Sequence, residues 1–158
     1  MNSVADLLVL PFKNVAPSAT QALYAGADSR ARSFIPFCGG QKRATAEQIA
    51  YKGNVGVPGS YGCNMMNVSA TATDSYSYVI KFVNSEDRAK RCECWNKIGP
   101  DGGNNGCFAG NQALSFEVPG ASEQHVVFDS NTQGACACSE GAVPLSPFGQ
   151  FASTWVEF

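Results

Sequence analysis

The chain has 158 residues, a formal net charge of −2 at pH 7 and a charged fraction of 15%, well below the roughly 25% of an average soluble domain. A nearly neutral chain has no basic field with which to hold nucleic acid or an anionic membrane. No stretch approaches the ~18 apolar residues of a membrane span. The length suits one core, so we expect residues 1–158 to form a single domain.

The first fifty residues carry few structural signals. Residues 1–12 read as a lone hydrophobic strand or an ordered arm, and the Ala-rich residues 18–33 as a short helix that Gly26 weakens. The apolar run after Asp6 is too short, and wrongly flanked, for a secretory signal. If the protein is secreted, we therefore expect this chain to be a mature form from which the signal has been removed. Thr45 and Gln48 have the spacing of a capping box, which predicts one or two helical turns ended by Gly53.

From Cys63 onward the pattern becomes that of short β-strands between Gly, Asn and Pro turns. Ile80 and Phe82 share one face of an alternating segment, and Phe116 and Val118 share one face of another. The expected strands are 64–72, 76–83, 91–96, 113–118, 124–129, 135–139 and 151–158. This pattern predicts a mainly β fold, an antiparallel β-sandwich or barrel of short strands, with one or two short N-terminal helices and disulfide stabilisation.

The segment 91–110, RCECWNKIGPDGGNNGCFAG, is the centre of this arrangement. Pro100, Asp101 and Gly102 suit one turn, and Asn105-Gly106 suits a second. We therefore expect strands 91–96 and 113–118 to form an antiparallel pair joined by a long turn-rich connection.

Seven cysteines are many for a chain of this size and favour an oxidising compartment. Residues two apart on a strand point the same way, so Cys92 and Cys94 share a face, as do Cys136 and Cys138. Four facing thiols can make cross-strand disulfides or a tetrahedral zinc site, or stay partly free, and the spacing of a zinc knuckle is absent. We predict at least one bridge between the two pairs. The other cysteines are predicted to be a Cys38–Cys63 bridge and a free thiol at Cys107.

Catalytic motifs are missing. His125 is the only histidine, and no nucleophile elbow, zinc-protease or phosphate-loop motif occurs. A glycosidase needs two carboxylates about 5–10 Å apart, and Glu93 and Glu117 are interpreted instead as solvated charges on strand faces. We assign no catalytic residue, no metal ligand and no cofactor.

Two features point toward sugars. Tyr76, Tyr78, Trp95 and Trp155 are candidates for a sugar-stacking platform, although the run into Ile80 favours a core role for these aromatics. Asn67-Val68-Ser69 is an acceptor sequence for N-linked glycosylation.

Four segments follow one another along residues 51–158: GNVGVPGSYGCNMMNV, WNKIGPDG, ALSFEVPGASEQHVVFDSNTQGA and FGQFASTWVEF. In this order they resemble the secreted fungal allergens typified by Asp f 4, and more loosely the fungal SUN cell-wall proteins, which are linked to β-1,3-glucan. The resemblance implies a secreted protein of the cell wall or culture fluid, in a family without a firmly established biochemical activity. Residues 1–50 lie outside it, and the disulfide pattern is not carried over from it.

The leading hypothesis is therefore a secreted, extracellular or cell-wall, non-enzymatic β protein that binds cell-wall β-glucan or a host glycan. A carbohydrate-active enzyme acting on β-1,3-glucan, as in SUN-like proteins, is the first alternative, and a thiol-metal binding protein is the second. The expected partner is a cell-wall polysaccharide, with no nucleic acid and no membrane. The chain is expected to be a monomer or a disulfide-linked dimer.

Overall fold

The computed structural model describes residues 34–42 and 44–158. The strand or arm expected over residues 1–12 and the helix expected over 18–33 lie outside the described residues. Within the described part of the chain, no helix is long and apolar enough to span a membrane.

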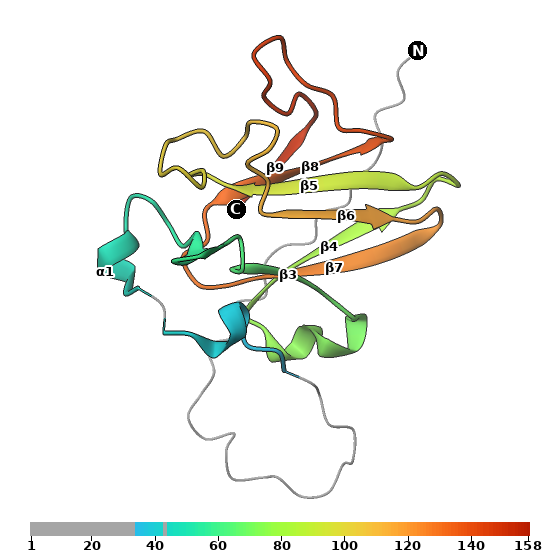
Figure 1. The fold of residues 1–158 in the computed structure, drawn as a ribbon. Coiled ribbons are helices and arrows are strands. Elements are labelled where there is room, and N and C mark those ends of the chain that lie inside the picture. The colour runs from blue at the N-terminus through green and yellow to red at the C-terminus, as the bar shows by residue number, and fades with distance from the viewer. Residues whose placement is uncertain (1–33, 43) are drawn as a thin grey trace, which may run out of the picture.

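Two antiparallel sheets make up the fold (Figure 1). One has the strand order β3-β7-β4 and the other β6-β5-β8-β9. The strands are β3 (Met65–Val68), β4 (Tyr78–Asn84), β5 (Lys90–Asn96), β6 (Leu114–Val118), β7 (Ser122–Phe128), β8 (Gly134–Glu140) and β9 (Trp155–Glu157). A small hairpin of β1 (Gly56–Val57) and β2 (Ser60–Tyr61), the helix α1 (Ala46–Ile49) and the 3-10 helices η2 (Phe37–Gly40) and η3 (Ala70–Ser75) complete it. The mainly β prediction is confirmed.

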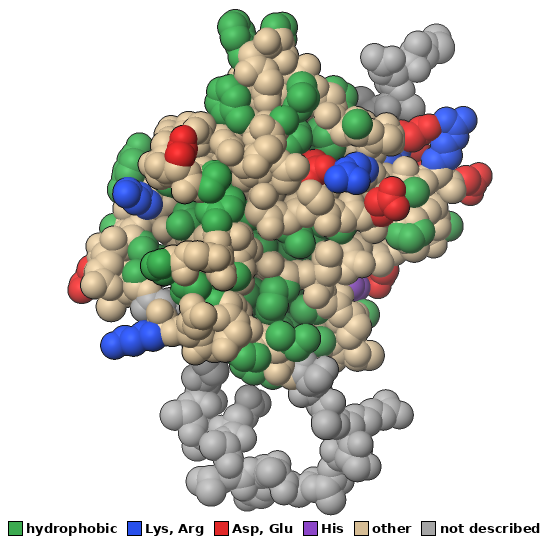
Figure 2. Space-filling view, in the orientation of Figure 1, with side chains coloured by type: hydrophobic (Ala, Val, Ile, Leu, Met, Phe, Trp, Pro, Cys, Tyr) green, Lys and Arg blue, Asp and Glu red, His purple; other side chains and the backbone are tan. Residues whose placement is uncertain are grey.

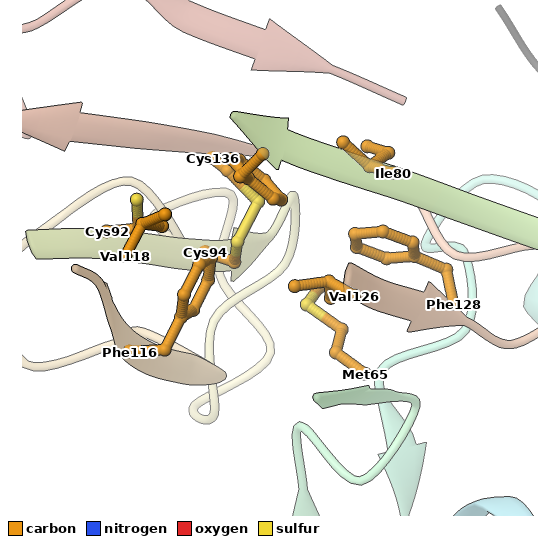
Figure 3. Packing of buried hydrophobic residues seen from close by; sticks show 10 residues of the cluster. Met65, Ile80, Cys92, Cys94, Phe116, Val118, Val126, Phe128 and Cys136 are labelled. Carbon is orange, nitrogen blue, oxygen red and sulfur yellow. A yellow bond between two sulfur atoms is a disulfide. The ribbon is translucent and has the colours of Figure 1, made fainter. Parts of the chain in front are cut away.

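The sheets pack face to face around one apolar core, so the architecture is a sandwich (Figure 3). The three-stranded sheet contributes Met65, Ile80, Phe82, Val126 and Phe128, and the four-stranded sheet contributes Cys92, Cys94, Phe116, Val118 and Cys136. Phe82 and Phe116 meet edge to face, with ring centroids 5.1 Å apart. The residues that alternation placed inward are therefore the ones that join the two layers.

Two disulfides connect neighbouring strands of the four-stranded sheet. Strand pairing sets Cys92 opposite Cys138 and Cys94 opposite Cys136, and both pairs are bonded, with Cα–Cα distances of 4.1 and 4.0 Å. The sequence predicted at least one bridge between these pairs, and the structure contains two. The two-residue spacing on each strand produces this arrangement, because it lets two side chains of one strand meet two of the next.

A third disulfide fastens the N-terminal side of the described chain. Cys38 is bonded to Cys63 with a Cα–Cα distance of 4.9 Å. Cys107 is the free cysteine. Both assignments agree with the expectation from the sequence.

The helix expected after Thr45 is present but short. The Thr45 hydroxyl accepts from the Gln48 N–H, and the Gln48 side chain accepts from the Thr45 N–H, so the capping box is formed. The N–H of Gly53 donates to the Ile49 carbonyl at 2.6 Å, and the positive φ of 70° at Gly53 turns the chain away.

Two expected strands are shorter in the structure. The 64–72 segment is strand only as far as Val68, because Ala70–Ser75 coil into η3, where the Thr73 hydroxyl donates to the Ala70 carbonyl at 2.8 Å. The 151–158 segment is continuous strand only over β9. Phe151 instead turns its backbone N–H to the Cys107 carbonyl, 2.9 Å away.

A buried amide network that the sequence did not reveal ties the turn before β3 to the end of β5. The Asn64 side-chain amide donates to the Asn96 side-chain oxygen at 2.8 Å and to the Asn54 carbonyl at 2.7 Å. The Asn54 amide donates in turn to a carboxylate oxygen of Asp129 at 3.0 Å. Because Asn64 and Asn96 are fully buried, these hydrogen bonds fix the polar end of the sandwich.

Candidate ligand-binding cleft

A second apolar cluster lies on the outer face of the four-stranded sheet. Its buried members are Trp95, Ala135, Ala137, Val143 and Phe151, and Cys107 packs against them. Cys92 and Cys94 on β5 point into the core. Trp95, the next residue on that strand, must therefore point to the outer face of the sheet. Ala135 stands directly opposite it on β8, and this small side chain leaves room for the indole.

Trp155 forms a partly open wall beside this cluster. Its side chain meets Trp95 edge to face at a centroid distance of 5.2 Å, and its indole N–H donates to the Phe151 carbonyl at 3.0 Å. Even so, Trp155 remains 38% exposed, whereas Trp95 is 2% exposed. Trp155 is thus an aromatic side chain that is fixed in position and still available to solvent.

A cleft of about 300 Å³ opens between these aromatics and the loop that follows β5. Apolar surface comes from the two tryptophans and the end of the chain, and polar groups come from the rim. The lining residues are Trp95, Lys97, Asn104, Cys107, Gln133, Gly134, Ala135, Trp155, Glu157 and Phe158. This mixture of aromatic surface and a few polar groups is typical of small-molecule sites.

The loop over residues 97–112 is held in place by backbone hydrogen bonds to the loop over 141–154. The Ala109 N–H donates to the Gly149 carbonyl at 2.9 Å, and Phe108 bridges Gln150 in an antiparallel contact. The Tyr61 hydroxyl lies 3.1 Å from the Ile98 carbonyl and 3.0 Å from the Asn111 carbonyl. Burial raises the pKa of this hydroxyl. The wall that carries Cys107 is therefore braced from two sides.

Tyr51 extends the aromatic surface past the rim. The Lys97 ammonium, which lines the cleft, lies 4.0 Å from the centroid of the Tyr51 ring and donates to the Tyr51 carbonyl at 3.1 Å. Gln133, also a lining residue, donates to the Ala50 carbonyl at 3.3 Å. Tyr51 is 71% exposed. Nothing local in the sequence marks it as part of a site, because only the folded chain brings the segment after α1 to β5.

Charge is distributed unevenly around the cleft. Charged side chains gather at the far end of the sheet, where β4 turns into β5 (Figure 2), whereas the surface over the 141–154 loop carries none. That loop, GAVPLSPFGQFAST, has no charged residue in its sequence. Lys97 and Glu157 are the charged residues of the lining. A ligand there meets little net charge.

Comparison with known proteins places the chain in a family. The model of the Allergen Asp f 4-like domain matches residues 63–158. The chain belongs to this family. It is 40% identical over 121 residues to Allergen Asp f 4 of Aspergillus fumigatus, which covers 76% of this chain and 37% of that protein. The chain thus spans little more than a third of that relative's length. No solved structure matches it.

The matched region contains nearly all of the features that form the cleft. Every residue of the lining, from Trp95 to Phe158, falls inside the Asp f 4-like match, whereas Tyr51 precedes it. The domain shared with this family therefore carries the cleft itself, and the neighbouring aromatic comes from the segment before the domain.

The two tyrosines named from the sequence lie elsewhere in this Asp f 4-like chain. The Tyr76 ring packs against Phe34 and Phe37, with centroids 5.4 and 5.6 Å away, and its hydroxyl is 2.9 Å from the Ile35 carbonyl. Tyr78 packs against the main core. The two tyrosines border a separate hollow of about 690 Å³ between β4 and the segment around η2. The four aromatics therefore form two separate groups rather than one platform.

The interpretation of Glu93 as a solvated charge is wrong. Glu93 is 5% exposed and lies on the central strand β5, opposite Ser115 on β6 and Ala137 on β8. Its carboxylate accepts from the Arg91 guanidinium at 2.7 Å and from the Ser115 hydroxyl. Glu117, by contrast, is exposed, as expected. His125 sits on β7 with its ring 3.8 Å from the Glu123 carboxylate, far in the fold from the cleft.

The four-thiol zinc hypothesis does not fit the structure. All four cysteines concerned are consumed in the disulfides between β5 and β8, so none offers a thiolate. Across the described residues, no group of three or more His, Cys, Asp or Glu side chains is arranged to hold a metal ion. The remaining thiol, Cys107, lines the cleft and is half-buried.

Proposed function

We propose that the chain is a secreted, non-enzymatic carbohydrate-binding protein that holds cell-wall β-glucan in the cleft beside Trp155. A pyranose ring presents an apolar face of C–H groups and a rim of hydroxyls. An aromatic wall with a polar rim is complementary to both. The cleft has this composition and a volume within the range of small-ligand sites.

The observation that carries the proposal is the state of Trp155. It is held by a ring contact with Trp95 and by a hydrogen bond to the Phe151 carbonyl, yet 38% of it is exposed. A side chain that is already ordered loses little conformational entropy when a ligand stacks on it. Trp155 is also not a member of either apolar cluster, so its position at the surface is not explained by a place in the core.

The polar rim supplies both directions of hydrogen bonding to sugar hydroxyls. The Lys97 ammonium donates, the Glu157 carboxylate accepts, and the Asn104 and Gln133 amides can do either. The low charge of the surrounding surface favours a neutral polysaccharide over an acidic one. Tyr51, whose ring lies beside the Lys97 ammonium of the rim, offers a second exposed aromatic side chain, which suits a chain of several sugars.

The cleft supports binding rather than hydrolysis. A glycosidase requires two carboxyl groups on either side of the scissile bond, and Glu157 is the carboxylate that lines this cleft. Glu93, on the same sheet face, is held by Arg91 and Ser115 and is not among the lining residues. The alternative of a β-1,3-glucan-acting enzyme would need a second carboxylate from outside the cleft.

Secretion is part of the proposal because of the cysteines. Six of the seven are paired in disulfides, and such bridges form and persist in oxidising compartments. Secretion would also bring the protein into contact with the polysaccharides of the cell wall.

The test is co-sedimentation of the oxidised protein with insoluble β-1,3-glucan, followed by analysis of the supernatant for released sugar. We expect retention of the wild type, competition by soluble β-1,3-gluco-oligosaccharides and no release. Trp155→Ala should abolish retention. Phe148→Ala is the matched control, because Phe148 is 80% exposed and lies outside the cleft lining. Equal retention of both variants would contradict the site, and sugar release would support the enzyme alternative.

A further inference from the structure

Asn67 lies in an edge strand and has an unoccupied amide. β3 pairs with β7 through Asn67 opposite Val126, and among the described residues it has no second neighbour in its sheet. The Asn67 side chain is exposed and makes no hydrogen bond within the described part of the chain. The other asparagines near it in the fold, Asn64 and Asn96, are buried and fully engaged.

The acceptor sequence around Asn67 is presented in an accessible form. Asn67-Val68-Ser69 is the only Asn-x-Ser/Thr triplet in the whole sequence. Ser69 is exposed and has extended backbone angles, φ −72° and ψ 155°. Its hydroxyl lies 3.0 Å from the Thr71 hydroxyl at the surface. An enzyme that reads the asparagine and the hydroxyl two residues later can therefore reach both groups.

We propose that Asn67 carries an N-linked glycan. In the transfer, the Asn67 side-chain nitrogen bonds to the anomeric carbon of an oligosaccharide carried on a lipid diphosphate. The bond from that carbon to the diphosphate breaks, the lipid diphosphate leaves with the electron pair, and the amide gives up one proton. The transfer is a substitution and needs no oxidant or reductant. This inference rests on the secretion part of the proposed function, and not on the glucan-binding part.

A glycan at this position has a structural consequence. Within the described part of the chain, β3 pairs with a strand on one side only, and an open edge is a template for pairing with another chain. A bulky, hydrated glycan attached within the strand hinders that approach. The cleft is lined by residues of the other sheet, on the face that carries the second apolar cluster, so the glycan leaves it open.

The test is the intact mass of the protein secreted from a eukaryotic host, before and after peptide N-glycosidase. We expect a heterogeneous mass that collapses to one value after the enzyme, with the modification mapped to the peptide that contains Asn67. Ser69→Ala should remove the modification, whereas Ser69→Thr, which keeps the acceptor hydroxyl, should retain it. Wild-type protein that is secreted with an unmodified Asn67 would overturn the proposal.

A second readout concerns the edge strand. Light scattering of the glycosylated protein should show less self-association than the same sample deglycosylated without denaturation. Equal self-association would overturn the protective role of the glycan. Glucan retention is measured separately on both samples, so failure of the cleft to bind glucan leaves the mass result unaffected.

Discussion

The indole of Trp95 lies nearly parallel to the ring of Phe151, with centroids 4.9 Å apart and planes inclined by 20°. Phe151 also accepts the indole N–H of Trp155 through its backbone carbonyl. One residue of the 141–154 loop thus covers the buried tryptophan and orients the exposed one.

Phe151→Ala should be strongly destabilising. Phe151 is 5% exposed, and removal of a buried aromatic ring typically costs about 3–5 kcal/mol because a cavity is left behind. The ring also shields Trp95, so tryptophan fluorescence in the native state should shift to longer wavelength. Urea denaturation of the variant gives the change in free energy of unfolding.

Phe148→Ala is the control for that measurement. It removes the same ring three positions earlier in the same loop, but Phe148 is 80% exposed, so the change should stay within about 0.5 kcal/mol. Similar losses for both variants would mean that the Trp95–Phe151 contact adds nothing.

Either of the two bridges between β5 and β8 should by itself supply most of the stabilisation that the two supply together. Cys92–Cys138 closes a loop with a sequence separation of 46, which the chain-entropy estimate values at about 4 kcal/mol. Cys94–Cys136 lies inside that loop, so once one bridge exists the other restricts the unfolded chain very little. Replacing either pair by alanine should therefore cost far less than half of the loss for both.

Urea denaturation of the two paired variants and of the variant lacking both bridges measures this coupling. A variant that lacks both bridges and does not fold, beside two paired variants that do, would agree with the expected large loss for both bridges together. Strictly additive losses would contradict it and would assign the stabilisation to local packing of each bridge.

How far the sequence determined these features depends on how local each one is. Alternation placed Phe116 and Val118 inward correctly, since a period of two follows from strand geometry alone. The spacing of Cys92 and Cys94 anticipated a partner strand with the same spacing. No local pattern revealed that Asn64 and Asn96 would meet in the interior, because Asn64 lies in the turn before β3 and Asn96 at the end of β5, in different sheets.

The cleft was harder to anticipate for the same reason. Trp95 and Trp155 are the same residue type on strands of one sheet, yet one is buried and the other partly exposed. Their difference comes from the 141–154 loop, which folds back over β5. Glu93, which local alternation on a strand face assigned to solvent, is buried between Ser115 on β6 and Ala137 on β8.

Cys107 should be the one cysteine of the chain that reacts with Ellman's reagent. Ellman assay of denatured, unreduced protein should therefore find one thiol per chain, in keeping with one free cysteine among seven. Labelling the native protein with a bulky maleimide should lower glucan retention, because Cys107 lines the cleft. Cys107→Ser, which keeps the size of the side chain small, should retain glucan as the wild type does. Full retention by the labelled protein would place the ligand elsewhere.

The same position bears on the oligomeric state. A disulfide-linked dimer through Cys107 would set a second chain over the cleft that Trp155 borders. Electrophoresis without reductant should accordingly find glucan-binding protein in the monomer band. Retention of a Cys107-linked dimer would contradict this geometry.

Asp101 should make the stability of the 97–112 loop depend on pH. The Gly103 N–H and then the Asn105 amide hold the pKa of the Asp101 carboxyl below its usual value. A lowered folded-state pKa means that the stabilisation is complete above the unfolded pKa of ~3.9. It is lost as the pH falls through the folded-state pKa.

Melting temperatures of the wild type and Asp101→Asn, measured from pH 7 down to strongly acidic solution, report this effect. The wild type should exceed the variant at neutral pH, and the gap should narrow in the acidic range. A gap that does not change with pH would rule out the carboxylate as its source.

The disulfides between β5 and β8 also determine what a protease can release. A cut in the loop after β5, or in the turn before β8, falls between Cys94 and Cys136, so both sides of the cut stay covalently joined. Because β5 and β8 remain joined side by side, they keep their backbone hydrogen bonds to each other. The two new chain ends produced by the cut therefore stay close together. Digestion at either one of these turns therefore leaves a cleaved domain that stays covalently in one piece until its disulfides are reduced.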